Sequence, residues 1–400
     1  MKSLRAIFTV LVALSLLSAL AVQRSFAQDA IKVGIILPLT GEKAKFGEIE
    51  KKSFEMALEE INAAGGANGK KIEFIYEDDT GRPDVARSAA EKLITKDKVA
   101  MLGGGYGSSE TFAIAGVAQQ NGVPFVISTG SDNKITEMKW DFIFRINPPV
   151  GDYPKGLESF LTEVVKPKTA AILFENTNFG SSGSREFEAI CKRLDIKVVL
   201  SEGYQSGGVD FKPLLVKVKQ ANPDLVYMIS YLMDASLLMN QSKELRITPK
   251  LFVGGAAGFT LPEFRQNAGK ASEGVFSATL WYQTLPYAGA KEYYDKFVKK
   301  YNMDTEYHGA EGYASAYVIA DALKRAKSLK PEDVRASLSA TDLMTVFGPV
   351  KFVAYDKMTN QNKLPTYLVQ WIDGKLELVW PKEIASKPFV YPVDWEKIWQ

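Results

Sequence analysis

Hydroxyl side chains follow a glycine cluster in the segment Gly103–Thr111 (G-G-G-Y-G-S-S-E-T). A short apolar run precedes this segment and apolar residues at helical spacing follow it, so it joins a strand to a helix. The glycines let the backbone turn sharply, and Ser108 and Ser109 stand where the helix begins. Free backbone N–H groups and the helix dipole favour an anion at that point. The segment could therefore bind a carboxylate or another anion, although hydroxyls at a helix start are more often plain caps.

Residue types that carry catalysis are scarce. The chain has one cysteine, Cys191, and one histidine, His308. A His-rich metal site is thereby excluded, and a Ser–His or Cys–His arrangement would need that single histidine. The run Asp304–Gly309 (D-T-E-Y-H-G) predicts a solvated loop histidine just before a helix. A pair such as Ser128 with Asp132 is the remaining catalytic option, so we expect a binding protein rather than an enzyme, without metal or cofactor.

Signals for nucleotide or cation binding are weak. The pattern Gly103-x-Gly105 approximates a dinucleotide fingerprint, but it lacks the third glycine and follows the third predicted strand instead of the first. The chain contains no G-x-x-x-x-G-K-[ST] run. Asp78 and Asp79 could hold a cation, although adjacent acids at a strand end are usually solvated or paired with a basic neighbour.

The start of the chain has the pattern of an export signal. Lys2 and Arg5 precede an uncharged apolar run at 6–22, and Ser25–Ala27 (S-F-A) is a small-x-small cleavage site. We predict a signal peptide over 1–27, with a retained membrane anchor as the alternative. The formal net charge of +2 includes the basic residues of this leader, so the rest of the chain is near neutral and nucleic acid is not an expected partner.

Alternating strand and helix patterns must position these groups. They predict an α/β protein with two doubly wound parallel sheets and right-handed crossovers. The first set of predicted strands is 31–37, 71–76, 99–102, 124–127 and 142–146, and the second is 169–174, 197–203, 225–229, 251–254 and 271–280. Helices at 291–301, 310–326 and 331–338 are expected to return to the first sheet. Late strands are predicted at 350–353, 366–371 and 376–379, with an Asp-Gly hairpin turn between the last two.

Ligands of an open parallel sheet bind beyond the carboxyl ends of its strands. The residues expected there are rich in hydroxyls, aromatics and glycines and contain neither histidine nor cysteine. They are 38–46, 105–109, 128–133, 175–179, 230–231 and 254–259. A nucleophile and its base are hard to assemble from this set, which favours binding over turnover.

An ordered series of short motifs runs along the chain. They are I-I-L-P-L-T-G at 35–41, I-N-x-x-G-G-x-x-G at 61–69, D-D at 78–79, P-x-x-A at 83–86, G-S-S at 107–109, G-V-P at 122–124 and F-G-P at 347–349. Each motif is loose alone, but their order is specific. The chain thus resembles type I periplasmic substrate-binding proteins of ABC transporters, in the branched-chain (leucine/isoleucine/valine) amino-acid-binding group, over about 31–378.

The resemblance implies two lobes joined by three crossing strands, near 145–148, 279–283 and 346–350. Lobe I would comprise 29–146 and 283–347, lobe II would comprise 147–282 and 348–380, and 381–400 would be a tail packed on the surface. The implied protein is a periplasmic monomer that captures a small carboxylate-bearing ligand of hydrophobic amino-acid type by hinge closure. Its implied partners are ABC transporter permease subunits. An exported sensor that signals to a receptor is the alternative.

The resemblance also implies roles for cleft residues. Ser108 or Ser109, and the loop at Ser131 and Asp132, match first-lobe groups that hold a ligand carboxylate. The aromatics matched to the ligand are Phe46 in the first lobe and Phe179 and Tyr231 in the second. Two further aromatics that could contact the ligand are Tyr106 and Trp281.

One position departs from the family pattern. Amino-acid binders of the family place an acidic residue after a second-lobe strand to hold the α-ammonium group. That position falls in 254–258 (G-G-A-A-G), where Ala256 cannot do so. A buried ammonium group without an acidic partner is costly. Either Asp132 takes the role, or the ligand is an aromatic or aliphatic organic acid without an amino group.

Overall fold

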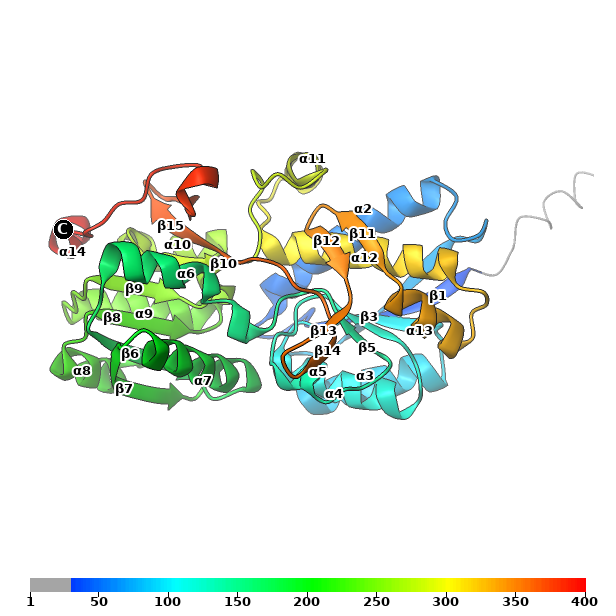
Figure 1. Ribbon diagram of the computed structural model, residues 1–400, viewed down its shortest axis with the longest axis horizontal. Coiled ribbons are helices and arrows are strands. Elements are labelled where there is room, and N and C mark those ends of the chain that lie inside the picture. The colour runs from blue at the N-terminus through cyan, green and yellow to red at the C-terminus, as the bar shows by residue number, and fades with distance from the viewer. Residues whose placement is uncertain (1–29) are drawn as a thin grey trace, which may run out of the picture.

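The computed structural model describes residues 30–400 and places them in two lobes that lie side by side (Figure 1). The predicted signal peptide and its cleavage site lie outside the described residues. Within 30–400 we find no helix with the length and apolar character needed to cross a membrane. Each lobe is built around a seven-stranded sheet, and a separate ribbon pairs β11 (Asp342–Thr345) with β12 (Gly348–Lys351).

The first sheet has the strand order β13-β14-β5-β4-β3-β1-β2. Its strands from β14 to β2 pair in parallel, and β13 at the edge is antiparallel to β14. The bounds are β1 (Ile31–Leu37), β2 (Ile72–Asp78), β3 (Met101–Gly104), β4 (Phe125–Ile127), β5 (Ile143–Arg145), β13 (Val353–Tyr355) and β14 (Met358–Gln361). The parallel strands confirm the doubly wound sheet that the alternating pattern predicts.

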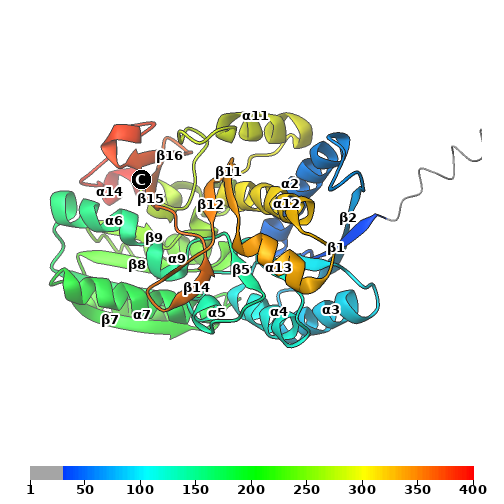
Figure 2. The same cartoon turned by 45° about the vertical axis from the view of Figure 1, so that its right-hand side comes forward.

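Helices cover both faces of the first sheet, because β1 carries apolar side chains on both. Val33 and Ile35 belong to one buried cluster with Phe54 of α2, and Ile36 belongs to another with Leu93 of α3 and Ile114 of α4. The returning α12 packs beside α2, as Figure 2 shows. The helices are α2 (Ala44–Ala63), α3 (Pro83–Thr95), α4 (Ser108–Gln120), α5 (Lys134–Glu137), α11 (Ala290–Tyr301), α12 (Tyr307–Arg325) and α13 (Pro331–Ser339).

The second sheet has the order β16-β15-β10-β9-β8-β6-β7, so its five parallel strands repeat the winding of the first lobe. Its strands are β6 (Thr169–Glu175), β7 (Lys197–Tyr204), β8 (Leu225–Ile229), β9 (Leu251–Gly254), β10 (Phe276–Thr279), β15 (Tyr367–Ile372) and β16 (Lys375–Trp380). Its helices are α6 (Lys155–Phe160), α7 (Asn178–Arg193), α8 (Lys212–Ala221), α9 (Leu232–Glu244) and α10 (Pro262–Ala268). β15 and β16 add to it in antiparallel fashion.

Single-turn and short helical segments complete the second lobe and its links. They are η1 (Val150–Asp152), the π-type η2 (Leu161–Val165), η3 (Ala257–Phe259), η4 (Gly269–Ser272), η5 (Lys382–Ile384) and α14 (Trp395–Trp399). The predicted strand 271–280 is shorter than expected, because η4 turns the chain before β10 begins. The final segment packs on the second lobe, where Trp395 is buried with its ring 5.1 Å from that of Phe252.

The third crossing lies later than the resemblance implies. β13 and β14 complete the first sheet, so residues 353–361 belong to lobe I and not to lobe II, and the chain crosses at 362–366. The physical reason is a buried contact in the sheet: Arg145 Nε donates to Gln361 Oε1 at 2.5 Å. The residues of β14 are mostly polar, so the sequence contains no apolar pattern that predicts a strand there. The other two crossings, after β5 and after β10, fall near their expected places.

Candidate functional site

A small cavity lies between the lobes, where loops beyond the strand ends of both sheets meet. The first lobe contributes loops after β3 and β4 and the start of α12, and the second contributes loops after β6, β8 and β9. The cavity volume is about 10 Å³, close to the space of one water molecule. We call it the inner cavity. Its lining residues are Tyr106, Ser108, Thr129, Ser131, Tyr153, Phe179, Tyr231, Ala257, Tyr307 and His308.

The glycine turn places Ser108 at the centre of the polar wall. Gly104 and Gly105 have φ angles of 92° and 81°, which explains the glycines before the helix. Ser108 Oγ accepts hydrogen bonds from the backbone N–H groups of Ser131 and Asp132, at 3.2 and 3.1 Å. Since these contacts use its lone pairs, the Ser108 hydroxyl hydrogen stays available for a ligand oxygen in the cavity.

Two of the predicted anchors have other partners. Ser109 Oγ accepts from the backbone N–H of Asn178 at 3.3 Å, which joins the first lobe to the start of α7 in the second. The Asp132 carboxylate accepts from the backbone N–H of Lys134 at 3.2 Å. Neither side chain lines the inner cavity, whereas Ser108 and Ser131 do. Ser109 therefore contacts the second lobe, Ser108 and Ser131 line the cavity, and the anchor roles predicted for all four residues stay predictions.

Four of the predicted aromatics form one cluster across the two lobes. The Phe46 and Tyr106 rings stack with centroids 4.7 Å apart in the first lobe. Tyr231 of the second lobe lies 6.1 Å from Phe46 and 5.5 Å from Phe179. All four are buried, and Phe46 supports the cavity from behind Tyr106. Aromatic pairs at these distances add about 0.5–1.5 kcal/mol beyond the area they bury.

A buried lysine joins this cluster. Lys43 Nζ lies 4.6 Å from the Tyr231 ring centroid and 3.1 Å from Glu110 Oε1. Burial raises the pKa of Asp79 and of Glu175 to about 7, and the Lys43 charge acts to lower both pKa values. The Lys43 charge therefore lies near carboxyl groups that both lobes bury. The sequence offered no signal for it, because a lysine ahead of an amphipathic helix is ordinarily solvated.

His308 is buried, which corrects the prediction of a solvated loop histidine. It is the second residue of α12 and only 1% exposed. Its Nδ1 lies 2.7 Å from Glu306 Oε1, and the Glu306 side chain also caps the helix. The next-door Tyr307 hydroxyl accepts from the backbone N–H of Ala257 in the second lobe, at 2.9 Å. These contacts fix the start of α12 between the two lobes.

Two buried carboxylates lie behind the polar wall. Thr129 Oγ1 is 3.0 Å from Glu50 Oε1 and 2.8 Å from Glu311 Oε2. One hydroxyl hydrogen can serve only one of these oxygens, so the other carboxyl group must be protonated to make its bond. Burial raises the pKa of Glu50 to about 8 and raises the pKa of Glu311 well above its ordinary value. Both acids lie on helices and were missed because charged helical residues ordinarily face water.

Ala256 and Trp281 do not line the inner cavity. Ala256 is buried after β9 with a left-handed φ of 64°, and its neighbour Ala257 faces the cavity instead. Trp281 lies at the second crossing, where its Nε1 donates to the Val346 carbonyl oxygen at 2.8 Å. Trp281 therefore lies beside the second crossing, and its predicted contact with a ligand stays a prediction.

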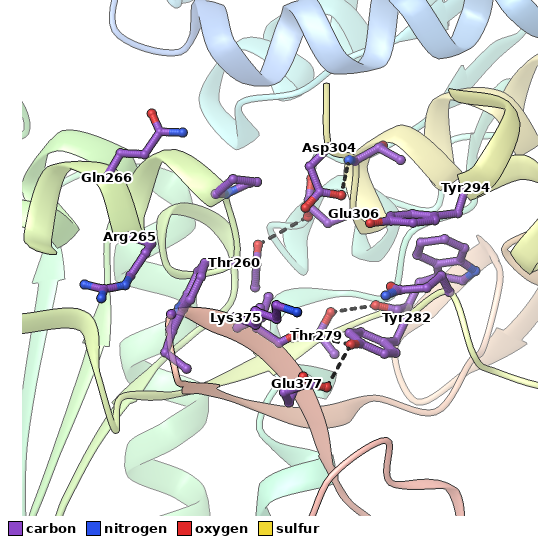
Figure 3. Close-up of a pocket in the computed structure, with 17 residues that line it drawn as sticks. Thr260, Arg265, Gln266, Thr279, Tyr282, Tyr294, Asp304, Glu306, Lys375 and Glu377 are labelled. Atoms are coloured by element: carbon purple, nitrogen blue, oxygen red, sulfur yellow. Dashed lines mark hydrogen bonds between the residues drawn. The ribbon is translucent and has the colours of Figure 1, made fainter. Parts of the chain in front are cut away.

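A larger pocket flanks the second crossing (Figure 3). Its volume is about 560 Å³, and Trp281 and Tyr282 line it together with Thr260 of the second lobe and Glu306 of the first. In the close-up, Thr260 and Glu306 point toward each other, with Thr260 Oγ1 donating to Glu306 Oε2 at 3.2 Å. The two oxygens of Glu306 thus face in different directions, one toward this flanking pocket and one toward His308.

The adjacent acids of the second strand hold the first loop instead of a cation. Asp78 Oδ1 accepts from the backbone N–H of Leu39 at 2.8 Å, and Asp78 Oδ2 accepts from the Thr40 hydroxyl at 2.5 Å. Asp79 accepts from the backbone N–H of Gly81 at 2.8 Å. Across residues 30–400, no three or more His, Cys, Asp or Glu side chains gather as a metal ion requires.

Comparison with known proteins agrees with this architecture. Residues 30–375 match the family of periplasmic binding proteins, and the chain belongs to that family. The Leu/Ile/Val-binding protein homolog 7 of Brucella melitensis is 28% identical over 396 residues, covering 96% of this chain and 99% of the relative.

Two solved structures share the type I periplasmic binding protein fold. One is the branched-chain amino acid transporter substrate-binding protein LivJ of Streptococcus pneumoniae in complex with isoleucine, with a TM-score of 0.79 and 26% identity over 87% of this chain and 98% of LivJ. The other is an ABC transporter solute-binding protein of R. palustris in complex with benzoate, with a TM-score of 0.78 and 20% identity over 90% and 97% of the two chains. At 20% identity, the similarity to the R. palustris protein shows the fold alone.

Proposed function

We propose that this chain is the periplasmic solute-binding component of an ABC transporter and captures a small carboxylate-bearing ligand between its lobes. The observation that carries the proposal is the Ser108 hydroxyl at the start of α4. It accepts from the backbone N–H groups of Ser131 and Asp132, and Ser108 lines the inner cavity. The hydroxyl and the positive end of the helix dipole suit a carboxylate. We expect the inner cavity to bind its ligand without covalent chemistry.

Closure about the three crossings is the proposed mechanism. The inner cavity is too small for a solute, so the lobes must separate before a ligand enters. Contacts such as Ala257 to Tyr307 and Ser109 to Asn178 then hold the closed form. A ligand that contacts both lobes stabilises closure by its differential affinity for the two states. The closed form is the one that would deliver the ligand to permease subunits.

The ligand is either of hydrophobic amino-acid type or an organic acid without an amino group. The Brucella relative and LivJ are named for branched-chain amino acids, and the R. palustris protein binds benzoate. The cavity wall favours an organic acid without an amino group, because Ala257 lines the cavity and the segment 254–258 contains no acidic residue. The carboxylate of Asp132, the substitute considered for that acid, accepts from the backbone N–H of Lys134 and does not line the inner cavity.

Thermal shift with a solute panel tests the proposal. The panel contains leucine, valine, phenylalanine, benzoate and 4-methylpentanoate, and isothermal titration calorimetry then measures each hit. Stabilisation by one or more of the carboxylates supports the proposed function, since a ligand that binds only the folded state raises Tm. Binding of leucine or valine with none of the deaminated acids would contradict the preference for an acid lacking an ammonium group. Absence of any shift across the panel would contradict the function itself.

A further inference from the structure

The segment 42–45, which leads into α2 of the first lobe, contacts the second lobe through two lysines. Lys43 is only 8% exposed, and its Nζ lies 4.6 Å from the Tyr231 ring centroid across the cleft. Lys45 lies at the rim, where its Nζ is 2.9 Å from Glu263 Oε1 and both side chains are partly exposed. The segment therefore brings one buried and one partly exposed cation to the second lobe.

Buried carboxyl groups from both lobes surround the first of these lysines. Glu110 Oε1 lies 3.1 Å from Lys43 Nζ. The Lys43 charge also acts on Asp79 and Glu175, and both of these side chains are fully buried. Burying a charged group is unfavourable unless an opposite charge compensates it. These carboxyl groups therefore depend on Lys43.

Closure brings one of these acids to the lysine. Lys43, Glu110 and Asp79 belong to the first lobe and stay together when the lobes separate, whereas Glu175 ends β6 of the second lobe. All three carboxyl groups act on the Tyr231 phenol, so they lie around one point of the closed cleft. Without Lys43, closure would bury Glu175 near two other acids with no compensating charge. The stabilising effect of Lys43 therefore falls mainly on the closed form.

We propose that Lys43 is a positioning residue for lobe closure, whose charge holds Glu175 and the Tyr231 ring of the second lobe against the first. This inference rests on the proposed function and deepens it, because closure is the step by which the chain would capture its solute. The attraction of a cation to an aromatic ring is stronger where water is excluded, as it is around Lys43. Lys43 does not line the inner cavity, so its role applies to any solute that the closed form encloses.

The same cluster makes closure depend on pH. Burial raises the pKa of Glu175 to about 7, and this pKa returns toward its ordinary value of 4.5 when separation exposes the side chain to water. The closed form therefore binds more protons between about pH 4.5 and 7, and closure weakens as pH rises through this window. The charged side chains that act on Glu175 or Asp79 are Lys43, Asp234, Glu110 and Asp78. Removing Lys43 deletes the charge that lowers both pKa values, so the window extends to higher pH.

Spin labels measure closure on the full chain without requiring a known ligand. They are placed at Arg87→Cys in α3 and Gln220→Cys in α8, two exposed positions on different lobes, after Cys191→Ala removes the native thiol. Pulsed electron–electron double resonance gives the populations of the closed and open distances. We expect Lys43→Met to lower the closed-to-open ratio about tenfold or more. Lys45→Met is the matched control and should change the ratio by less than about threefold, because its ion pair is partly exposed.

A substitution of Glu175 links the effect to its charge partner. Glu175→Gln removes the carboxylate that closure buries near Lys43, so adding it to Lys43→Met should restore the ratio to within about threefold of the parent. Glu175→Gln alone should flatten the fall in closure between about pH 4.5 and 7. Circular dichroism checks the fold of each variant, and the pH profile of Glu175→Gln decides the question if Lys43→Met does not fold.

The outcomes separate this inference from the function beneath it. Equal effects of Lys43→Met and Lys45→Met, or no recovery in the double variant, would overturn the role of Lys43 while carboxylate binding in the solute panel stands. An unchanged pH profile in Glu175→Gln would overturn it as well. So would the lack of a closed distance in the parent chain, with and without the panel carboxylates. Binding of no panel carboxylate, together with the expected changes in closure, would contradict the proposed function and support the role of Lys43.

Discussion

The two walls of the inner cavity differ more than the lobes that carry them. In both sheets five successive parallel strands follow the same order, and the first sheet adds β14 as a sixth. The first-lobe wall nevertheless combines serine, threonine and histidine side chains with the rings of Tyr106 and Tyr307, whereas the second consists of Tyr153, Phe179, Tyr231 and Ala257. One lobe offers polar groups, and the other covers them with rings and a small side chain. The difference depends on a few residues beyond the strand ends, which shows how one fold can serve unlike ligands.

Removing the polar contact at the helix start should have the largest effect. Ser108→Ala deletes the hydroxyl that we propose donates to a ligand carboxylate, and with it the acceptor for two backbone N–H groups. A hydrogen bond to a charged group contributes about 1.5–3 kcal/mol, so we expect affinity for any bound carboxylate to fall about 10- to 100-fold by calorimetry. Ser236→Ala is the control, because that buried serine donates to its own helix in the second lobe. Equal loss in both variants would remove Ser108 from the anchor.

Removing the covering ring should have a smaller effect. Tyr231→Ala loses the contacts to Phe46 and Phe179 and the face that Lys43 approaches. Aromatic and cation–π contacts contribute about 1 kcal/mol each, and we expect affinity to fall about tenfold, mainly through faster dissociation in stopped-flow measurements. Tyr231→Phe keeps the ring and should stay within about twofold of the parent. A large loss in Tyr231→Phe would point to the hydroxyl and not to the covering role.

Placing a charge after β9 should narrow the difference between the walls. Ala256 has φ 64° and ψ −141°, a backbone conformation that glycine favours, and it directly precedes Ala257, which lines the inner cavity. We expect Ala256→Asp to raise the affinity for leucine relative to 4-methylpentanoate by about three- to tenfold, because a nearby carboxylate stabilises a buried ammonium group. Ala256→Asn matches it in shape without the charge. An identical ratio in the two variants would show that residue 256 does not reach the ligand.

The buried acids behind the polar wall should make stability depend on pH. Burial raises the pKa of Glu50 to about 8, so the folded state binds more protons than the unfolded state between about pH 4.5 and 8. The contribution is therefore largest below that window, and the free energy of unfolding falls as pH rises through it. We expect Glu50→Gln to flatten this slope by about 1 kcal/mol per pH unit in urea titrations. An unchanged slope would show that Glu50 is not the titrating group.

The regular elements of the fold could be predicted from the sequence because their apolar patterns are local. The strands at 225–229 and 251–254 have the predicted bounds, and the Asp373–Gly374 turn has the expected left-handed backbone. The glycine turn and the aromatic cluster could also be predicted, since clustered glycines indicate a turn and rings beyond strand ends tend to pack where the loops meet. Their roles toward a ligand stay predictions.

The polar groups of the cleft could not be predicted in the same way. Glu50 lies on α2 and Glu311 on α12, at charged positions that resemble solvated ones, and both are buried where these two helices pack together. His308 follows a polar run that is typical of a loop, but its ring is buried beside Phe46 and Tyr106, with ring centroids 4.9 and 5.3 Å away. Such burial is set by residues far away in sequence, which a local pattern does not contain. The one local sign was the pair of hydroxyl residues Ser128 and Thr129 after β4, which hydrogen-bond to Glu50.

The late third crossing has a consequence for how this chain becomes a protein. Arg145 and Gln361, whose side chains join β5 to β14, are 216 residues apart in sequence. As a chain is synthesised, β5 and β10 keep open edges until the segment from 353 to 380 has emerged. Pairings across such distances slow folding, and open strand edges invite association with other chains. Until β14 and β15 pair with β5 and β10, both sheets keep an open edge through which the new chain can aggregate.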